Sequence, residues 1–550
     1  MHKALSRSLL TRLAIAVGSI FIFASFNGAT HLFDWDEINF AESAREMLVS
    51  GNFSTVQINF RPFWEKPPLF IWMQALSMQL FGVNEFAARF PNAICGMATL
   101  LLLFHAGEKL RGYRFGLLWT LIYAGSFLPF FYFKSGIIDP WFNLFIFSSA
   151  WLLMRYTDPG FTGSKPLTAA VSGILIGLGM LTKGPVALLI LSLTVAVFFL
   201  IRRFRVNANG WHVGLFFVAA ALTGGSWFLW QWAAGNEQII RDFIEYQIRL
   251  FNTKDAGHGG FLLYHFIVVL IGVFPASLFM IASLKKEKNS DPVLRHYYVW
   301  NLILLLTVLI LFTIVKTKIV HYSSLAYLPL SFLAATYLHA RIERSERLPS
   351  WLTVTAGVLV AFFALKMIVL SFIDDFKPLL LNSDLIKDRF AKANLQADGG
   401  WLHIEWVTGL ILLAGFARFI KQNRQNKIFA ATASLFVSCM LFLYLSMVLV
   451  VPKVERYSQR ALIEFCQSVS DRNAWVVTFG FKSYANYFYA RREPLDMPHG
   501  GDELAAVTAS ADKEVYAVIK IDKKEKYLEM YPQLEVLYEK NGFVFTRWVN

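Results

Sequence analysis

The sequence predicts an all-α polytopic membrane protein that ends in a small soluble α/β domain. Of its 550 residues, 56% are hydrophobic and 16% are aromatic, and the mean hydropathy is +0.47. Many apolar segments are long enough to cross a hydrocarbon core of about 30 Å, which takes roughly 20 residues. The last hundred residues lack such segments and carry as many acidic as basic side chains.

We expect about thirteen transmembrane helices. The first follows a basic amino end and is retained rather than cleaved as a signal peptide. Residues 69–81 are apolar but too few to cross, so we expect a surface or half-buried helix there. The expected spans are residues 13–26, 86–108, 115–133, 140–157, 166–182, 185–201, 211–232, 261–283, 297–316, 321–340, 351–373, 401–420 and 428–451.

The net charge of +14 is a signal of topology rather than of nucleic-acid binding. Its basic residues cluster in short loops between apolar segments, and such loops lie in the cytoplasm of bacterial membrane proteins. All the clusters fall on one side of the expected spans. The first loop, residues 31–85, and the carboxyl end then lie on the outer side.

Two domains are expected, a transmembrane domain at residues 1–451 and a soluble α/β domain at residues 452–550. In the second domain, residues 474–480, 514–520 and 542–548 have the pattern of strands, and residues 454–469 and 523–531 that of helices. The three cysteines show no CxxC spacing, so neither a disulfide framework nor a zinc ribbon is indicated.

The first outer loop holds the main candidate site. Residues 38–51 have the spacing of an amphipathic helix that would lie along the bilayer surface. Acids at its start, Asp36 and Glu37, would serve to cap the helix in the plainest interpretation. Glu65 and Lys66 follow in the same loop, and this combination of acids and a cation favours a functional site at the membrane surface.

Further charged residues fall on the same outer side. Asp139 precedes Pro140 in FKSGIIDPW, an arrangement that also starts a helix well. Lysines at the outer ends of helices can simply extend to the membrane interface. Here several outer turns carry lysines and no acidic residue of the same turn, which favours a binding site for an anionic headgroup, most simply phosphate. These outer residues are Lys134, Lys183, Lys316, Lys318, His321 and Tyr322.

Arg249 and His258 lie in the loop of residues 233–260 and are candidates to join this site, although loop residues of these types are more often ordinary surface. Glu65 and His258 are too few ligands to indicate a zinc site. We therefore expect no cofactor, and a divalent metal stays an open alternative that the residues do not indicate. The sequence lacks GxxxxGK[ST], GxGxxG, HExxH and GxSxG motifs. A group-transfer enzyme of this kind needs a donor that is already activated in the membrane.

The chain resembles the GT-C glycosyltransferases of the protein mannosyltransferase superfamily, within the bacterial branch that contains the 4-amino-4-deoxy-L-arabinose lipid A transferase. The resemblance rests on DE followed by AESAREM, FWEKPPL, SGIIDP, LTKGP, a KTKxxHY turn and a soluble outer domain. It implies an enzyme of the bacterial inner membrane that takes a sugar from a polyprenyl (undecaprenyl) phosphate carrier. The acceptor would be lipid A, another glycan or a protein, at the periplasmic face.

The resemblance also implies residue roles. Asp36 corresponds to the catalytic aspartate and Asp139 to a second, supporting acid. Lys66 corresponds to a lysine that contacts the carrier phosphate, with Lys183 and Tyr322 as further contacts. Cations that hold the leaving phosphate would stabilise the transition state, and Asp36 would act as a general base in an inverting displacement if the acceptor is a hydroxyl.

The main alternative is a transporter or flippase of lipid-linked sugars. Transporters often contain inverted repeats with charged residues near the middle of the bilayer. This sequence shows no such repeat, and its candidate residues gather on one face, which favours an enzyme. A mere membrane anchor for the soluble domain would need only one or two spans.

Overall fold

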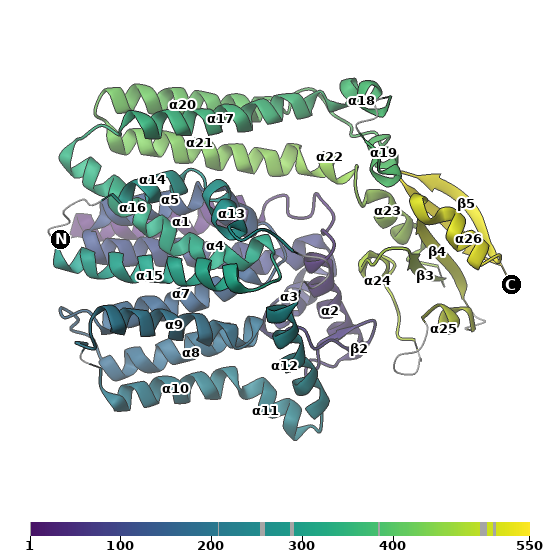
Figure 1. Cartoon of the computed structure of the whole chain (residues 1–550), viewed down its shortest axis with the longest axis horizontal. Helices are drawn as coiled ribbons and strands as arrows, with labels where there is room; N and C mark the ends of the chain where they lie inside the picture. Colours follow the sequence, from purple (N-terminus) through teal and green to yellow (C-terminus); the bar gives the residue numbers. More distant parts are fainter. Residues whose placement is uncertain are drawn as a thin grey trace.

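The computed structural model describes residues 2–206, 208–253, 259–285, 291–382, 386–472, 474–495, 503–509 and 513–549. A bundle of roughly parallel helices fills one part of the molecule, and a small sheet with its own helices lies at one end (Figure 1). The bundle consists of α1 His2–Ala24, α4 Glu85–Arg111, α5 Tyr113–Ala124, α6 Phe127–Tyr132, α7 Asp139–Tyr156, α8 Lys165–Lys183, α9 Val186–Ile201, α10 Gly210–Gly224, α11 Ser226–Ala233, α13 Tyr264–Gly272, α14 Ala276–Ser283, α15 Pro292–Ile314, α16 Tyr327–Arg344, α17 Ser350–Ser371, α20 Val407–Arg424 and α21 Ile428–Leu449.

Among the described residues, six helices are long and apolar enough to cross a membrane, namely α1, α4, α8, α15, α17 and α21. The count rises to eight if two bent pairs are each one span: α10 with α11, bent by 50°, and α13 with α14, bent by 113°. Helices also occupy the other expected spans, but they are shorter or less apolar. A multi-pass membrane protein is therefore confirmed, while thirteen crossings stay a prediction.

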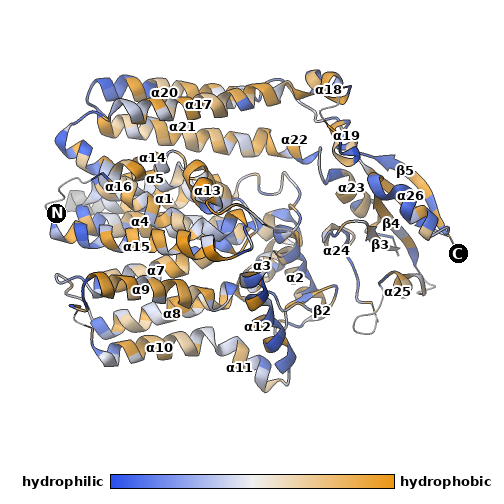
Figure 2. Ribbon diagram, in the orientation of Figure 1, coloured by the Kyte–Doolittle hydropathy of each residue, from blue (hydrophilic) through white to orange (hydrophobic). Residues whose placement is uncertain are grey.

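The two ends of the bundle differ. Figure 2 shows apolar residues along the helices and hydrophilic residues at the end remote from the sheet, around the loop between α16 and α17. Arg341 and Arg344 lie in the last turn of α16, and Arg347 follows in that loop. The other end carries α2 Asp36–Ser50, the hairpin of β1 Gln57–Ile58 and β2 Arg61–Pro62, α3 Leu69–Phe81, α12 Glu237–Asn252 and the short 3₁₀ helix η2 Val320–Ala326. Nearer to the sheet lie α18 Ile373–Leu381 and α19 Arg389–Leu395.

The carboxyl-terminal part forms a four-stranded sheet in the order β3-β4-β6-β5, with β3 parallel to β4 and the other pairs antiparallel. Alternate residues of β4 serve different cores: Tyr516 and Val518 pack toward α23 and α2, while Val515, Ala517 and Ile519 pack on the opposite face. Its elements are α22 Val451–Glu455, α23 Arg460–Val469, β3 Ala474–Phe479, α24 Ala485–Phe488, α25 Glu503–Ala509, β4 Glu514–Lys520, η3 Ile521–Lys523, α26 Lys524–Met530, β5 Leu534–Lys540 and β6 Phe543–Trp548.

Three of these strands, β3, β4 and β6, lie where the sequence predicted strands. The predicted helix at residues 454–469 is interrupted between α22 and α23. Strand β5 was not predicted, because it is an edge strand with exposed side chains after Leu534 and therefore lacks an apolar face.

Helix α2 corrects the expectation of an interfacial helix at residues 38–51. It ends at Gly51, whose φ of 69° is left-handed, but residues Glu37 to Met47 are all buried. The charged face is enclosed because its charges are satisfied inside the protein. Arg45 pairs with Glu42 at 2.7 Å, and the Glu46 carboxylate accepts hydrogen bonds from the amides of Asn59 and Phe60 at 2.6 and 2.7 Å.

Candidate functional site

Helix ends from distant parts of the sequence bring the candidate residues together. Asp36 is the first residue of α2, Asp139 the first of α7 and Lys183 the last of α8. His321 and Tyr322 lie in η2. Because polar groups at helix ends need partners outside the helix, this junction concentrates charge at the end of the bundle that faces the sheet.

Asp139 and Lys183 form the core of the site. The Lys183 Nζ lies 2.6 Å from the Asp139 Oδ1, and the side chain of Asp139 is only 3% exposed. The same ammonium lies 5.1 Å from the centre of the Tyr322 ring. Asp139 therefore holds Lys183 in place rather than simply capping α7, and Tyr322 provides an aromatic wall for the cation.

His321 links the two predicted acids. Its Nε2 lies 3.6 Å from the Asp36 Oδ2 and 4.0 Å from the Asp139 Oδ2. The Asp36 side chain is 42% exposed, in contrast to the buried Asp139, so Asp36 is the acid that a substrate can reach. The sequence predicts His321 on this side, next to Tyr322 in the KTKIVHY turn, but only the structure shows that its imidazole lies between the two acids.

Lys66 supplies a second cation. Its Nζ lies 5.1 Å from the centre of the Tyr246 ring. Burial lowers the pKa of Lys66; Lys183 lowers it further, while Glu65, Asp36 and Asp139 act in the opposite direction. These influences indicate that Lys66 lies near Asp36, Asp139 and Lys183.

Two other predicted residues stand at the edge of the site. Arg249 lies in the last turn of α12 rather than in a loop, and its guanidinium lies 5.1 Å from the same Tyr246 ring, toward Lys66. The Glu65 carboxylate is close enough to raise the pKa of Lys66, against the larger lowering effect of burial. His258 lies outside the described residues. Within the described ranges, no group of three or more His, Cys, Asp or Glu side chains is arranged to hold a metal ion.

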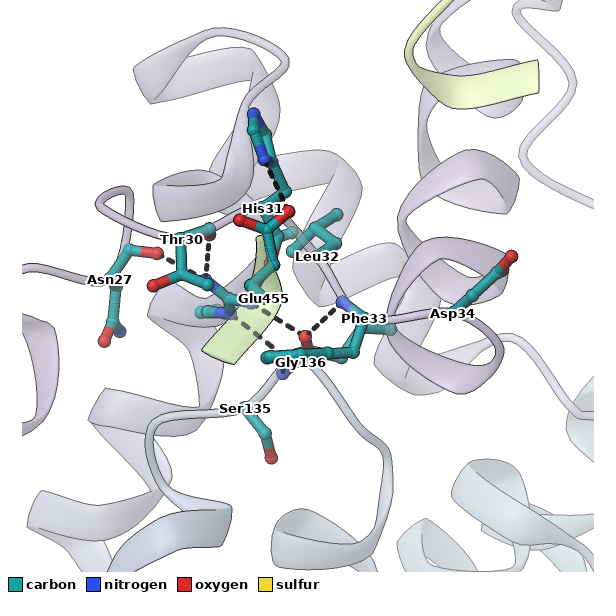
Figure 3. Close-up of polar contacts among 12 residues, drawn as sticks. Asn27, Thr30, His31, Leu32, Phe33, Asp34, Ser135, Gly136 and Glu455 are labelled. Atoms are coloured by element: carbon teal, nitrogen blue, oxygen red, sulfur yellow. Dashed lines mark hydrogen bonds and ion pairs between the residues drawn. The ribbon is translucent and has the colours of Figure 1, made fainter. Parts of the chain in front are cut away.

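The sequence predicts Glu37 beside Asp36 as a substrate-binding part of the functional site, but the structure encloses its side chain. Its carboxylate accepts hydrogen bonds from the Arg89 guanidinium at 2.8 and 3.0 Å and from the Phe33 amide at 2.9 Å. The Gly136 amide donates to the same carboxylate at 2.5 Å. Figure 3 shows Phe33 and Gly136 close together, with the Asp34 side chain pointing away from them. Because all these donors belong to the protein itself, Glu37 holds the first loop in place.

We expect Glu37→Gln to lower the free energy of unfolding by about 3–5 kcal/mol, because it leaves the buried Arg89 charge without its partner. Thermal unfolding of the purified protein in lipid would measure this loss. Molecules that remain folded should keep the wild-type KM for substrate. A raised KM at unchanged thermal stability would instead restore Glu37 to the substrate site.

Two of the outer lysines also have structural roles. Lys134 donates hydrogen bonds to the carbonyl oxygens of Ile22 and Ser25 at 3.1 and 2.8 Å, at the end of α1. Lys318 donates likewise to carbonyl oxygens at the end of α15, at 2.6 to 2.8 Å. These cations neutralise the carbonyl ends of helices, so both ammonium groups already have partners inside the protein.

The carboxyl-terminal part closes over the segment that precedes Asp36. Asp34 accepts hydrogen bonds from the Ser483 hydroxyl and from the Tyr484 amide. The Gln459 side chain makes two hydrogen bonds to the backbone of this segment: it accepts one from the Asp34 amide at 3.1 Å and donates one to the Leu32 carbonyl at 2.7 Å. The position of Asp36 is therefore set jointly by the bundle and the sheet domain.

Comparisons with known proteins agree with this arrangement. Residues 65–227 match the family model described as dolichyl-phosphate-mannose-protein mannosyltransferase, a range that contains Lys66, Asp139 and Lys183. The chain is 26% identical over 351 residues to the undecaprenyl phosphate-alpha-4-amino-4-deoxy-L-arabinose arabinosyl transferase of Shewanella sediminis, covering 62% of this chain and 61% of the relative. The chain thus matches about three fifths of the length of such curated relatives.

A solved structure extends the likeness to almost the whole chain. ArnT from Cupriavidus metallidurans, solved bound to undecaprenyl phosphate, is 18% identical and superposes with a TM-score of 0.73 over 98% of this chain and 97% of that chain. The two chains share a fold. These comparisons confirm the resemblance indicated by the sequence motifs: the chain is similar, in sequence and in fold, to the aminoarabinose transferase branch of the GT-C glycosyltransferases.

Proposed function

We propose that this protein is an integral membrane glycosyltransferase that moves a sugar from a polyprenyl phosphate carrier to an acceptor. The observation that carries the proposal is the pairing of a reachable carboxylate with fixed cations. Asp36 is 42% exposed and lies beside His321, while Lys183 is fixed by Asp139 at 2.6 Å and Lys66 shares their electrostatic field. Relatives named for transfer from undecaprenyl phosphate support the choice of carrier.

These residues suit the chemistry of a single displacement. The bond between the anomeric carbon and the carrier phosphate oxygen breaks, and both electrons leave with the phosphate. Lys66 and Lys183 stabilise the developing charge, with Arg249 at the edge of the site. The acceptor oxygen attacks from the opposite side, which inverts the anomeric centre. Asp36 takes the proton of a hydroxyl acceptor, or orients an acceptor that is already ionised.

The topology completes the proposal. Thirteen crossings place the basic loops in the cytoplasm and the site in the periplasm of a bacterial inner membrane. The domain of residues 1–451 then holds the donor, and the soluble domain of residues 452–550 lies in the periplasm. Lipid A, another glycan or a protein serves as acceptor, and the reaction requires neither a nucleotide nor a nucleic-acid partner.

The test uses the purified full-length protein in lipid with a mixed extract of polyprenyl phosphate sugars and outer-membrane lipids. Mass spectrometry should show loss of the lipid-linked sugar, release of free polyprenyl phosphate and one new glycosylated product, whose mass identifies the acceptor. Asp36→Asn serves as the inactive control. If the donor pool is unchanged but the donor moves between the leaflets of sealed vesicles, the transporter alternative replaces the transferase.

A further inference from the structure

The loop after β3 brings a lysine to the segment that precedes Asp36. Lys482 is exposed, and its Nζ lies 5.0 Å from the centre of the Trp35 ring and 5.2 Å from that of Tyr484. Trp35 is the residue directly before Asp36, and it is 43% exposed. A cation of the sheet domain therefore lies at the edge of the site that the bundle builds.

The position of this cation is set by its surroundings. Tyr484 contacts Trp35 edge to face with ring centres 5.6 Å apart, and its amide donates to Asp34 at 3.1 Å. Contacts between an ammonium and aromatic faces are favourable, so two rings hold Lys482 near one place. A lysine that is positioned in this way loses less entropy on binding than one that moves freely.

Lys482 has no ion pair within 4.0 Å among the side chains that the structure describes. The nearby acids have other roles: Asp34 is occupied by Ser483 and Tyr484, while Asp36 lies beside His321. Asp34 is also the carboxylate whose pKa burial raises and Lys482 lowers. Beyond this weak interaction, the exposed ammonium is available to a ligand.

The cations around Asp36 thus come from two sources. Lys183 ends helix α8 of the bundle and Lys66 lies in the loop before α3. They lie over Tyr322 and Tyr246, respectively, and both serve the donor phosphate in the proposed transfer. Lys482 comes from the sheet domain and lies over Trp35. A second positioned cation, on another domain, is suited to a second anionic group. The acceptor is the substrate that would carry this group, because the donor phosphate is held by Lys66 and Lys183.

We propose that Lys482 binds an anionic group, a phosphate or a carboxylate, of the acceptor, so that the sheet domain selects acidic acceptors for Asp36. This inference rests on the proposed sugar transfer. Trp35 and Tyr484 act as positioning residues that hold the ammonium. The soluble domain then contributes to substrate selection besides covering the first loop.

The probe is lipid A with both of its phosphates, compared with dephosphorylated lipid A, offered to the full-length protein in lipid. We expect Lys482→Ala to raise the KM for phosphorylated lipid A about tenfold and Lys482→Glu to raise it further, because each removes a charge-assisted contact. The donor KM should not change, and Lys482→Arg should restore the acceptor KM. Lys526→Ala is the matched control, since Lys526 is exposed and lies over its neighbour Tyr527 at 5.5 Å.

Two results would overturn the inference: an acceptor KM for Lys482→Ala and Lys482→Glu equal to that of Lys526→Ala, or an equal effect on phosphorylated and dephosphorylated lipid A. Direct binding of phosphorylated lipid A separates this test from that of the proposed function. If the wild type transfers no sugar, the transferase proposal fails. Weaker binding by Lys482→Glu than by the wild type would still support the anion site, and equal binding would reject it.

Discussion

Replacing Asp36 with asparagine should lower kcat for sugar transfer by about 10²- to 10⁴-fold, the usual contribution of a positioned general base. Asparagine keeps the size and the polarity of the side chain but cannot take a proton from the acceptor. His321, 3.6 Å from the carboxylate, would lose its charged neighbour as well. Initial rates measured at saturating donor and acceptor would test this prediction.

A matched control for this experiment is Asp522→Asn, an acid whose side chain is 35% exposed in the sheet domain. It should transfer sugar at the wild-type rate. The donor KM of Asp36→Asn should stay near that of the wild type, because the cations that hold the phosphate are intact. Full activity of a folded Asp36→Asn protein would remove Asp36 from the chemistry and leave it only an orienting role.

Replacing Lys66 with methionine should lower kcat/KM for the lipid-linked donor by about 10²- to 10³-fold, because a preorganised charge at the leaving phosphate is lost. The thermal midpoint should not fall with it. A half-buried ammonium is costly to desolvate, and methionine removes that cost while keeping the apolar stem. If Lys66→Met loses activity while its thermal midpoint is unchanged or higher, Lys66 has a functional rather than a structural role.

The pH dependence of the same step provides a second measurement. Because burial and the nearby Lys183 lower the pKa of Lys66 despite Glu65, the free enzyme loses this charge at a lower pH than an exposed lysine would. Donor kcat/KM should therefore be full below that pKa and fall as the pH rises through it. In Lys66→Arg the guanidinium stays protonated, so the fall should move to higher pH. If the fall of kcat/KM at high pH is the same in Lys66→Arg as in the wild type, another group is responsible for that fall.

Much of the fold was predictable because the signals that carry it are local. Apolar segments separated by short basic loops identify a multi-pass membrane protein, and helices lie at every expected span. Period-two alternation predicted β3, β4 and β6. The number of crossings was less predictable because a helix can bend, as α13 and α14 do by 113°, without any change in composition.

The candidate site was predictable as a group of residues but not as a geometry. Asp36, Lys66, Asp139, Lys183 and Tyr322 do come together at one end of the bundle. Their likeness to a family motif and their shared outer side were enough to select them. Neither signal distinguishes a charged side chain that faces the substrate from one whose ion pairs and hydrogen bonds are made inside the protein.

Glu37 and Lys318 show what the tertiary structure alone decided. In the sequence, Glu37 differs little from its neighbour Asp36, yet its carboxylate is occupied by the nearby Phe33 amide and by two donors from distant segments, Arg89 and the Gly136 amide. Lys318 lies three residues before His321, yet its ammonium binds the carbonyl end of α15. Because hydropathy and helix length are local properties, the sequence was enough to indicate which charges gather at the end of the bundle that faces the sheet. The tertiary structure then settles which of them stay free for a substrate, because a charged side chain is either occupied or left free by the groups that folding brings around it.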